Sequence, residues 1–230
     1  MSNDVRLRRT FALWFGLGCG AAGVVASRVT LHWEIPDDVS THVSAAASGW
    51  PVPVLIALLL TGSAVTVGTG TYLAARRVAQ SRERLLPFAL TWAGVAMCAA
   101  GLNVYLAYFP LEFEQLPAPS LRQHLLITLP MAGLTGGLVS SLVLGAPASR
   151  IGLSAGVWAI AMLLPGVFAV PLIYLGVGGS IDAFERAGLG ASAGHVVGFF
   201  LSSLLMGYLA AALGAVATVP ALRGEQACRP

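Results

Sequence analysis

Residues 194–219, GHVVGFFLSSLLMGYLAAALGAVATV, contain no Asp, Glu, Lys or Arg. A helix needs about 20 apolar residues to cross a hydrocarbon core about 30 Å thick, and this run is long enough. Five further runs share its apolar character, so transmembrane helices are expected at about 10–31, 51–75, 85–109, 124–146, 153–178 and 194–219. The sequence predicts an all-α, polytopic integral membrane protein whose residues 1–230 form one compact bundle of six transmembrane helices.

The composition excludes a water-soluble domain. The 230 residues are 57% hydrophobic and 10% charged, whereas soluble domains carry about 25% charged residues. The net charge of +3 comes from arginines placed as topology signals, so a lipid bilayer is the expected partner and nucleic acid is not. The chain has no lysine and is rich in Ala, Gly, Val and Leu, a composition typical of a GC-rich bacterial genome.

Arginines mark one side of the predicted bundle. Ten of the 13 basic residues precede the first run, follow the sixth, or lie in two of the loops: Arg6, Arg8, Arg9, Arg76, Arg77, Arg82, Arg84, Arg150, Arg223 and Arg229. Seven of the ten acidic residues fall in the other three loops: Glu34, Asp37, Asp38, Glu112, Glu114, Asp182 and Glu185. Because cytoplasmic loops are enriched in Arg and Lys, both termini are expected in the cytoplasm, with the chain in the bacterial inner membrane.

Small residues recur at four-residue spacing in three of the runs. They are Gly62, Thr66, Gly70 and Ala74; Gly133, Gly137, Ser141 and Gly145; and Ser203, Gly207, Ala211 and Ala215. Such stripes let helix backbones approach closely in lipid. We expect them to pack the bundle internally, and contact with a second subunit is the alternative.

Pro165 and Pro171 predict that the fifth helix kinks or unwinds near mid-membrane. Broken helices of transporters expose backbone groups that bind substrates, so this segment is a candidate substrate site; a structural kink without a ligand is the alternative. The only strong amide within the runs is Asn103. It is expected to bridge two helices through a hydrogen bond, and a substrate role is its alternative.

All four histidines map to the outer side of this topology: His32, His42, His124 and His195. Together with Asp37 and Asp38 they are candidates for binding a ligand or a protein partner. Imidazole and carboxylate groups also suit zinc or a pH sensor, but no pair has ligand spacing on one helix, so a metal role stays open. No cofactor is expected.

Two motifs, Gly152-Leu153-Ser154-Ala155 and Gly194-His195-Val196-Val197-Gly198, resemble those of rhomboid-type intramembrane serine proteases. Ser154 would enter its helix from the cytoplasm, whereas His195 would enter its helix from outside. A nucleophile and its base must lie within hydrogen-bond reach, so this pair is not expected to act together. The protein is therefore not expected to be an enzyme.

The segment Ile35-Pro36-Asp37-Asp38-Val39-Ser40-Thr41-His42, followed by Gly49-Trp50, stands between the first two predicted helices. It resembles the N-terminal domain of SdpI-type bacterial membrane proteins, in which a proline, a branched residue and a histidine recur between two helices. Val43 departs from that pattern, which has an aromatic residue after the histidine. The resemblance covers about residues 20–75 and implies a multi-helix protein of the immunity or signalling kind.

Two hypotheses follow for the function. The first is a non-enzymatic membrane protein of the immunity, sensor or accessory-subunit type, which recognises a ligand or partner at its outer loops. Its arginine-rich segment 76–84 would then meet a cytoplasmic protein or anionic lipid. The alternative is a transport component, either a facilitator or the membrane subunit of a permease, that uses the broken fifth helix.

Overall fold

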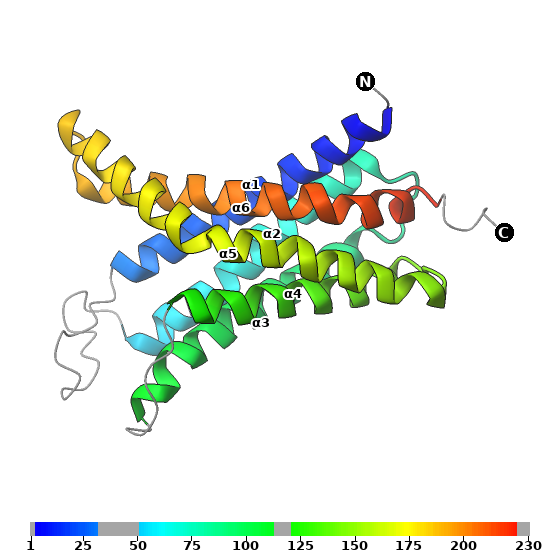
Figure 1. The fold of residues 1–230 in the computed structure, drawn as a ribbon, viewed down its shortest axis with the longest axis horizontal. Coiled ribbons are helices and arrows are strands. Elements are labelled where there is room, and N and C mark those ends of the chain that lie inside the picture. Colours follow the sequence, from blue (N-terminus) through cyan, green and yellow to red (C-terminus); the bar gives the residue numbers. More distant parts are fainter. Residues whose placement is uncertain (1–2, 32–50, 113–120, 225–230) are drawn as a thin grey trace.

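The computed structural model describes residues 3–31, 51–112 and 121–224, and the regular elements within those ranges are all α-helices (Figure 1). They are α1 (Asn3–Leu31), α2 (Val52–Val78), α3 (Leu85–Glu112), α4 (Leu121–Val143), α5 (Ala148–Arg186) and α6 (Ala191–Leu222). All six are long and apolar enough to cross a membrane. The predicted all-α class and the six apolar helices are confirmed.

Five of the six helices are longer than the apolar runs that predicted them, whereas α4 ends at Val143, before residue 146. The fifth was expected to end near residue 178, yet α5 continues to Arg186. An apolar run ends at the first charged residues, whereas a helix continues until its backbone leaves helical geometry. This happens after α5 at Gly188 and Gly190, whose φ angles of 72° and 84° favour glycine.

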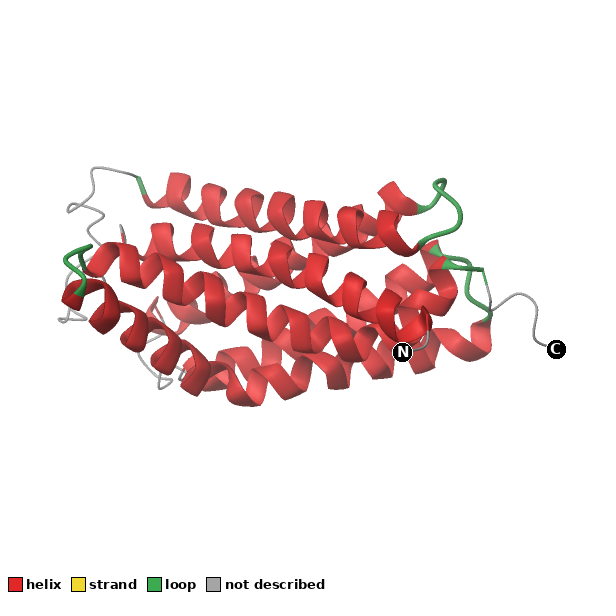
Figure 2. Ribbon diagram, turned by 90° about the horizontal axis from the view of Figure 1, so that it is seen from above, coloured by secondary structure: helices red, strands yellow, loops and turns green. Residues whose placement is uncertain are grey.

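The helices are arranged as a closed ring. Each packs against the next helix in the chain, and α6 packs against α1. Both termini lie at the same end of the bundle (Figures 1 and 2). There Asp4 and Arg223 form an ion pair of 3.0 Å, which joins the first turn of α1 to the end of α6. We call this end, which includes residues 3–9, 79–84, 144–150 and 222–224, the arginine end, and the opposite end the far end.

Five aromatic side chains fill the centre of the ring. Phe11 and Phe15 of α1, Phe88 and Trp92 of α3, and Trp158 of α5 are each at most 1% exposed. Ring centroids lie 5.1 Å apart for Phe15 and Trp92, and 4.4 Å apart for Trp92 and Trp158. Because α1, α3 and α5 are not neighbours in the ring, their side chains can meet only at its centre. We call these five residues the aromatic plug.

Glycines make room for the two tryptophans of the plug. A Cβ atom at Gly136 of α4 would lie 2.8 Å from the Trp92 ring, and one at Gly214 of α6 would lie 2.5 Å from the Trp158 ring. Such distances are shorter than van der Waals contact. The plug therefore depends on missing side chains in the two helices beside it.

The predicted small-residue stripes pack inside the bundle. A Cβ atom at Gly70 of α2 would lie 2.6 Å from the Gly18 Cα atom of α1, and one at Gly207 of α6 would lie 2.5 Å from the Cys19 Cβ atom. The stripe of α4 faces α5, because a Cβ atom at Gly137 would lie 2.8 Å from the Ser154 carbonyl oxygen. The expectation of internal packing is confirmed for all three stripes.

Of the two outcomes predicted at the prolines of the fifth helix, a kink or unwinding, unwinding does not occur. α5 is one continuous helix of 39 residues that contains both Pro165 and Pro171. A backbone without access to water has no hydrogen-bond partners outside the helix, so unwinding would cost more than the bonds that proline removes. The weaker form of the prediction, a kink, agrees with the change of direction that α5 makes near its middle in Figure 1.

Candidate functional sites

The residues predicted to bind at the outer side fall into two groups. His32, Asp37, Asp38 and His42 lie outside the described residues, so their role remains a prediction. His124 and His195 lie in α4 and α6 at the far end, near the first residues of their helices. These two helices pack on opposite sides of α5.

His195 packs its ring against Phe199, with ring centroids 4.8 Å apart. Its Nδ1 atom is buried and has no hydrogen-bond partner among the described residues. In the part of the chain that the structure describes, no group of three or more His, Cys, Asp or Glu residues could hold a metal ion. A metal site involving residues 32–50 therefore stays a prediction.

Asn103 connects α3 and α4. Its Oδ1 atom accepts a hydrogen bond of 3.3 Å from the Thr128 hydroxyl, and its Nδ2 atom donates one of 2.9 Å to the Ala99 carbonyl. The predicted bridge between helices is confirmed. Both ends of the amide are engaged within the protein, which gives the alternative substrate role no support.

The proline segment of α5 packs against α4. Pro165 is buried and Pro171 is exposed. A Cβ atom at Gly166 would lie 3.4 Å from Leu129 Cδ1 and 3.5 Å from the Leu125 carbonyl oxygen. The predicted substrate site at a broken helix therefore loses its basis, because the backbone is helical there and one side is covered by α4.

Ser154 and His195 lie at opposite ends of the bundle. Ser154 is in the second turn of α5 at the arginine end, and His195 is in the second turn of α6 at the far end. The Ser154 hydroxyl is buried and donates a hydrogen bond of 3.4 Å to the Gly137 carbonyl. The sequence predicted that Ser154 and His195 do not act together as nucleophile and base, and their positions at opposite ends agree with this prediction.

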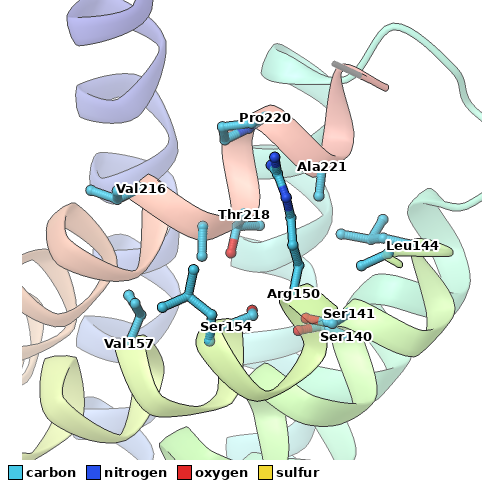
Figure 3. A pocket seen from close by; sticks show the side chains of 13 residues that line it. Ser140, Ser141, Leu144, Arg150, Ser154, Val157, Val216, Thr218, Pro220 and Ala221 are labelled. Atoms are coloured by element: carbon cyan, nitrogen blue, oxygen red, sulfur yellow. The ribbon is translucent and has the colours of Figure 1, made fainter. Parts of the chain in front are cut away.

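A cavity of about 120 Å³ lies at the arginine end between α4, α5 and α6 (Figure 3). Its lining combines one arginine, four hydroxyl groups and apolar side chains: Ser140, Ser141, Leu144, Ala146, Arg150, Leu153, Ser154, Val157, Val216, Ala217, Thr218, Pro220 and Ala221. We call it the Arg150 cavity.

The four hydroxyl groups of the Arg150 cavity all form hydrogen bonds within the helix bundle. Ser140 and Ser141 donate to the Gly136 and Gly137 carbonyls at 2.5 and 2.7 Å, within α4. Thr218 is different, because its Oγ1 atom accepts a hydrogen bond of 3.0 Å from Trp158 Nε1 of the aromatic plug. The hydrogen of the Thr218 hydroxyl has no acceptor among the described residues.

The Arg150 side chain extends from α5 toward Pro220 and Ala221 of α6 (Figure 3). It makes no hydrogen bond or ion pair with the described residues. Arg84, in contrast, donates through Nη1 to the Leu144 carbonyl at the end of α4. A side chain at position 145 would collide with the Arg84 guanidinium group. The φ angle of 71° at Gly145 also favours glycine.

The Arg150 cavity could not be predicted from the sequence. Arg150 was interpreted as a topology signal and Ser141 as part of a packing stripe, and both interpretations are local. The hydroxyl groups come from three helices, and Thr218 is 60 residues from its partner Trp158. No spacing along the chain indicates that these residues meet.

Charge is divided unevenly between the two ends. The described arginines at the arginine end are Arg6, Arg8, Arg9, Arg76, Arg77, Arg82, Arg84, Arg150 and Arg223, and the acidic residues there are Asp4 and Glu83. At the far end, Asp182 and Glu185 stand beside Arg186 in the last turns of α5. The predicted clustering of arginines at one end is thus confirmed among the described residues. Four of the seven acidic residues predicted for the other side, Glu34, Asp37, Asp38 and Glu114, lie outside the described residues.

Comparison with protein-family models, with curated proteins and with solved structures finds no match to this chain. The fold and site define a bundle of six apolar helices of the kind that membranes hold, with a sealed centre and a basic cavity at one end.

Proposed function

We propose that the chain is a multi-pass protein of a bacterial inner membrane with both termini in the cytoplasm. The division of charge supports this orientation, because arginines are retained on the cytoplasmic side of membrane proteins. The arginine end would then lie at the cytoplasmic surface and the far end outside.

Within that membrane, the protein acts as a non-enzymatic immunity, sensor or accessory component that recognises a ligand or partner at its outer loops. The aromatic plug is the observation that supports this function best. Five side chains at most 1% exposed fill the centre of the ring. Recognition at the ends of the bundle fits such a sealed centre better than passage through it. The resemblance of residues 35–42 to SdpI-type proteins supports the same reading.

A transport component is the second candidate. The change of direction in α5 favours it, because bent helices of transporters move one part of a bundle against another. The aromatic plug would have to separate in the transport cycle. We rank this candidate lower because α5 remains helical at Pro165 and packs there against α4.

Purification of the full chain from its native cell in mild detergent tests the choice. Mass spectrometry of co-purifying proteins and bound metals should reveal a stoichiometric partner. The variant Asp37→Asn/Asp38→Asn should reduce recovery of that partner about tenfold, whereas Arg6→Gln, at the arginine end, should leave it unchanged. A monodisperse protein without a partner would contradict the recognition role and favour the facilitator.

A further inference from the structure

We propose that the Arg150 cavity binds the phosphate group of an anionic phospholipid, with Arg150 and Thr218 as hydrogen-bond donors. This inference rests on the proposed membrane location, which puts the arginine end at the height of lipid headgroups. It assigns a specific ligand to a cavity that the recognition role at the far end does not use.

Arg150 is the main cationic donor available to such a ligand. Its guanidinium group offers five N–H donors in a planar fork that matches phosphate oxygens. Three other arginines at this end have partners: Arg84 donates to the Leu144 carbonyl, Arg223 pairs with Asp4, and Arg77 lies 5.2 Å from the centroid of the Trp14 ring. Arg150, half-buried at the cavity, has no such partner in the described ranges.

The hydroxyl groups of the cavity determine which hydrogen-bond donors and acceptors the ligand needs besides a group that binds Arg150. Thr218, 3% exposed, can donate its hydrogen because its oxygen already accepts from Trp158. Ser140 and Ser141 donate their hydrogens to backbone carbonyls, so their oxygens are left as acceptors. A ligand that joins a phosphate to hydroxyl groups meets both requirements, and the glycerol headgroup of phosphatidylglycerol has this chemistry.

The apolar residues of the cavity favour a lipid over free phosphate. Leu153 and Val216 are 66% and 48% exposed, and on a membrane helix such side chains contact acyl chains. A lipid whose phosphate reaches Arg150 can lay an acyl chain along these two residues and bury apolar surface, which a free phosphate cannot do. The volume of about 120 Å³ suits a small headgroup.

Pro220 supports the same site from α6. A proline nitrogen carries no hydrogen, so the carbonyl of Val216, a lining residue four positions earlier, lacks its usual helical donor. A headgroup hydroxyl can supply that donor. The cavity therefore contains both donors for a phosphate and acceptors for hydroxyl groups.

Native mass spectrometry of the full chain in detergent, titrated with phosphatidylglycerol or phosphatidylcholine, tests the inference. The unmodified protein should retain phosphatidylglycerol at least tenfold more tightly. Arg150→Gln should reduce this retention about tenfold, and Thr218→Val should reduce it less while Thr218→Ser preserves it. The matched control Arg6→Gln removes an exposed arginine at the same end and should change retention less than twofold.

Two further measurements make the result decisive. The melting temperature of Arg150→Gln in lipid-free detergent should equal that of the unmodified protein, and a decrease would show that Arg150 stabilises the fold instead. Inorganic phosphate should not displace the lipid at equal concentration; Arg150-dependent displacement would show a free-phosphate site and overturn the lipid assignment. Equal retention by Arg150→Gln and the unmodified protein would overturn the site itself. None of these readouts depends on a protein partner, so they fail independently of the proposed recognition role.

Discussion

Gly214 has no side chain, and the Trp158 ring occupies the space that a side chain there would need. The indole lies where a Cβ atom of residue 214 would project, and its Nε1 atom thereby reaches Thr218 on the same helix α6. Gly136 plays the corresponding part for Trp92. Single residues therefore decide whether the aromatic plug can form, because a close-packed interior has no space for an added methyl group.

Gly214→Ala should lower the free energy of unfolding by about 1–3 kcal/mol, the usual cost of overpacking. The new Cβ atom would lie 2.5 Å from the indole of Trp158, which must shift. Thermal or denaturant unfolding in detergent measures the effect. Gly156→Ala is the matched control on α5, because a Cβ atom there meets nothing within 4 Å. Equal effects of the two variants would contradict the packing role of Gly214.

Asn103→Leu should destabilise the protein by roughly 0.6–2 kcal/mol, the range measured for hydrogen bonds between membrane helices. The change removes the bond from Thr128, which joins α3 to α4. Thr91→Val is the control, since the Thr91 hydroxyl donates only to the Pro87 carbonyl of its own helix. If both variants unfold at the same temperature as the parent protein, the bridge contributes nothing to stability.

At the scale of a single element, α5 shows how a membrane helix tolerates proline. Pro165 and Pro171 each remove one backbone donor, yet the helix continues for 39 residues. Its first half packs against α4 through the glycines of that helix, and its second half packs against α6, where a Cβ atom at Gly198 would lie 2.5 Å from Val177 Cα. The bend lets one helix follow two different neighbours.

Pro165→Ala/Pro171→Ala should straighten α5 and move its far end. A change of about 20° acting over the ~20 Å between the prolines and Arg186 displaces that end by roughly 5–8 Å. Spin labels at Glu185→Cys and Leu134→Cys, in a background lacking the native cysteines, measure the shift. Pro87→Ala is the control, because a proline in the first turn of α3 removes no helical hydrogen bond. An unchanged distance would show that packing against α6 sets the bend.

At the scale of the whole molecule, ring closure and charge act together. An even number of antiparallel helices places both termini at the arginine end, where Asp4 and Arg223 pair. The closed ring in turn encloses the aromatic plug, whose buried side chains fill the centre of the bundle. Each end is thus free to serve a separate partner.

Labelling of single cysteines in intact cells tests the orientation of the whole molecule. A membrane-impermeant maleimide should react with Leu189→Cys at the far end and spare Ser149→Cys at the arginine end. Both positions are exposed in the bundle, so disruption of the cells should make both react. Labelling of Ser149→Cys in intact cells, with Leu189→Cys protected, would reverse the proposed topology.

The sequence by itself determined the number and class of the helices, the division of charge and the internal role of the glycine stripes. These are local properties, because the length of an apolar run and the spacing of small residues are sufficient to define a membrane helix and its packing face. His124, His195 and Asn103 were also placed on the correct helices, and the Asn103 bridge followed from the cost of an unpaired amide in an apolar interior.

Only the tertiary structure decided how the ring closes, that α5 remains helical, and which side chains fill the centre. Phe15, Trp92 and Trp158 come from three helices and meet because those helices converge. The Arg150 cavity arises in the same way, from hydroxyl groups on α4, α5 and α6. Such contacts depend on the crossing angles of the helices and on close approach between distant segments. They are stabilised by the packing of the whole bundle and not by any local stretch of sequence.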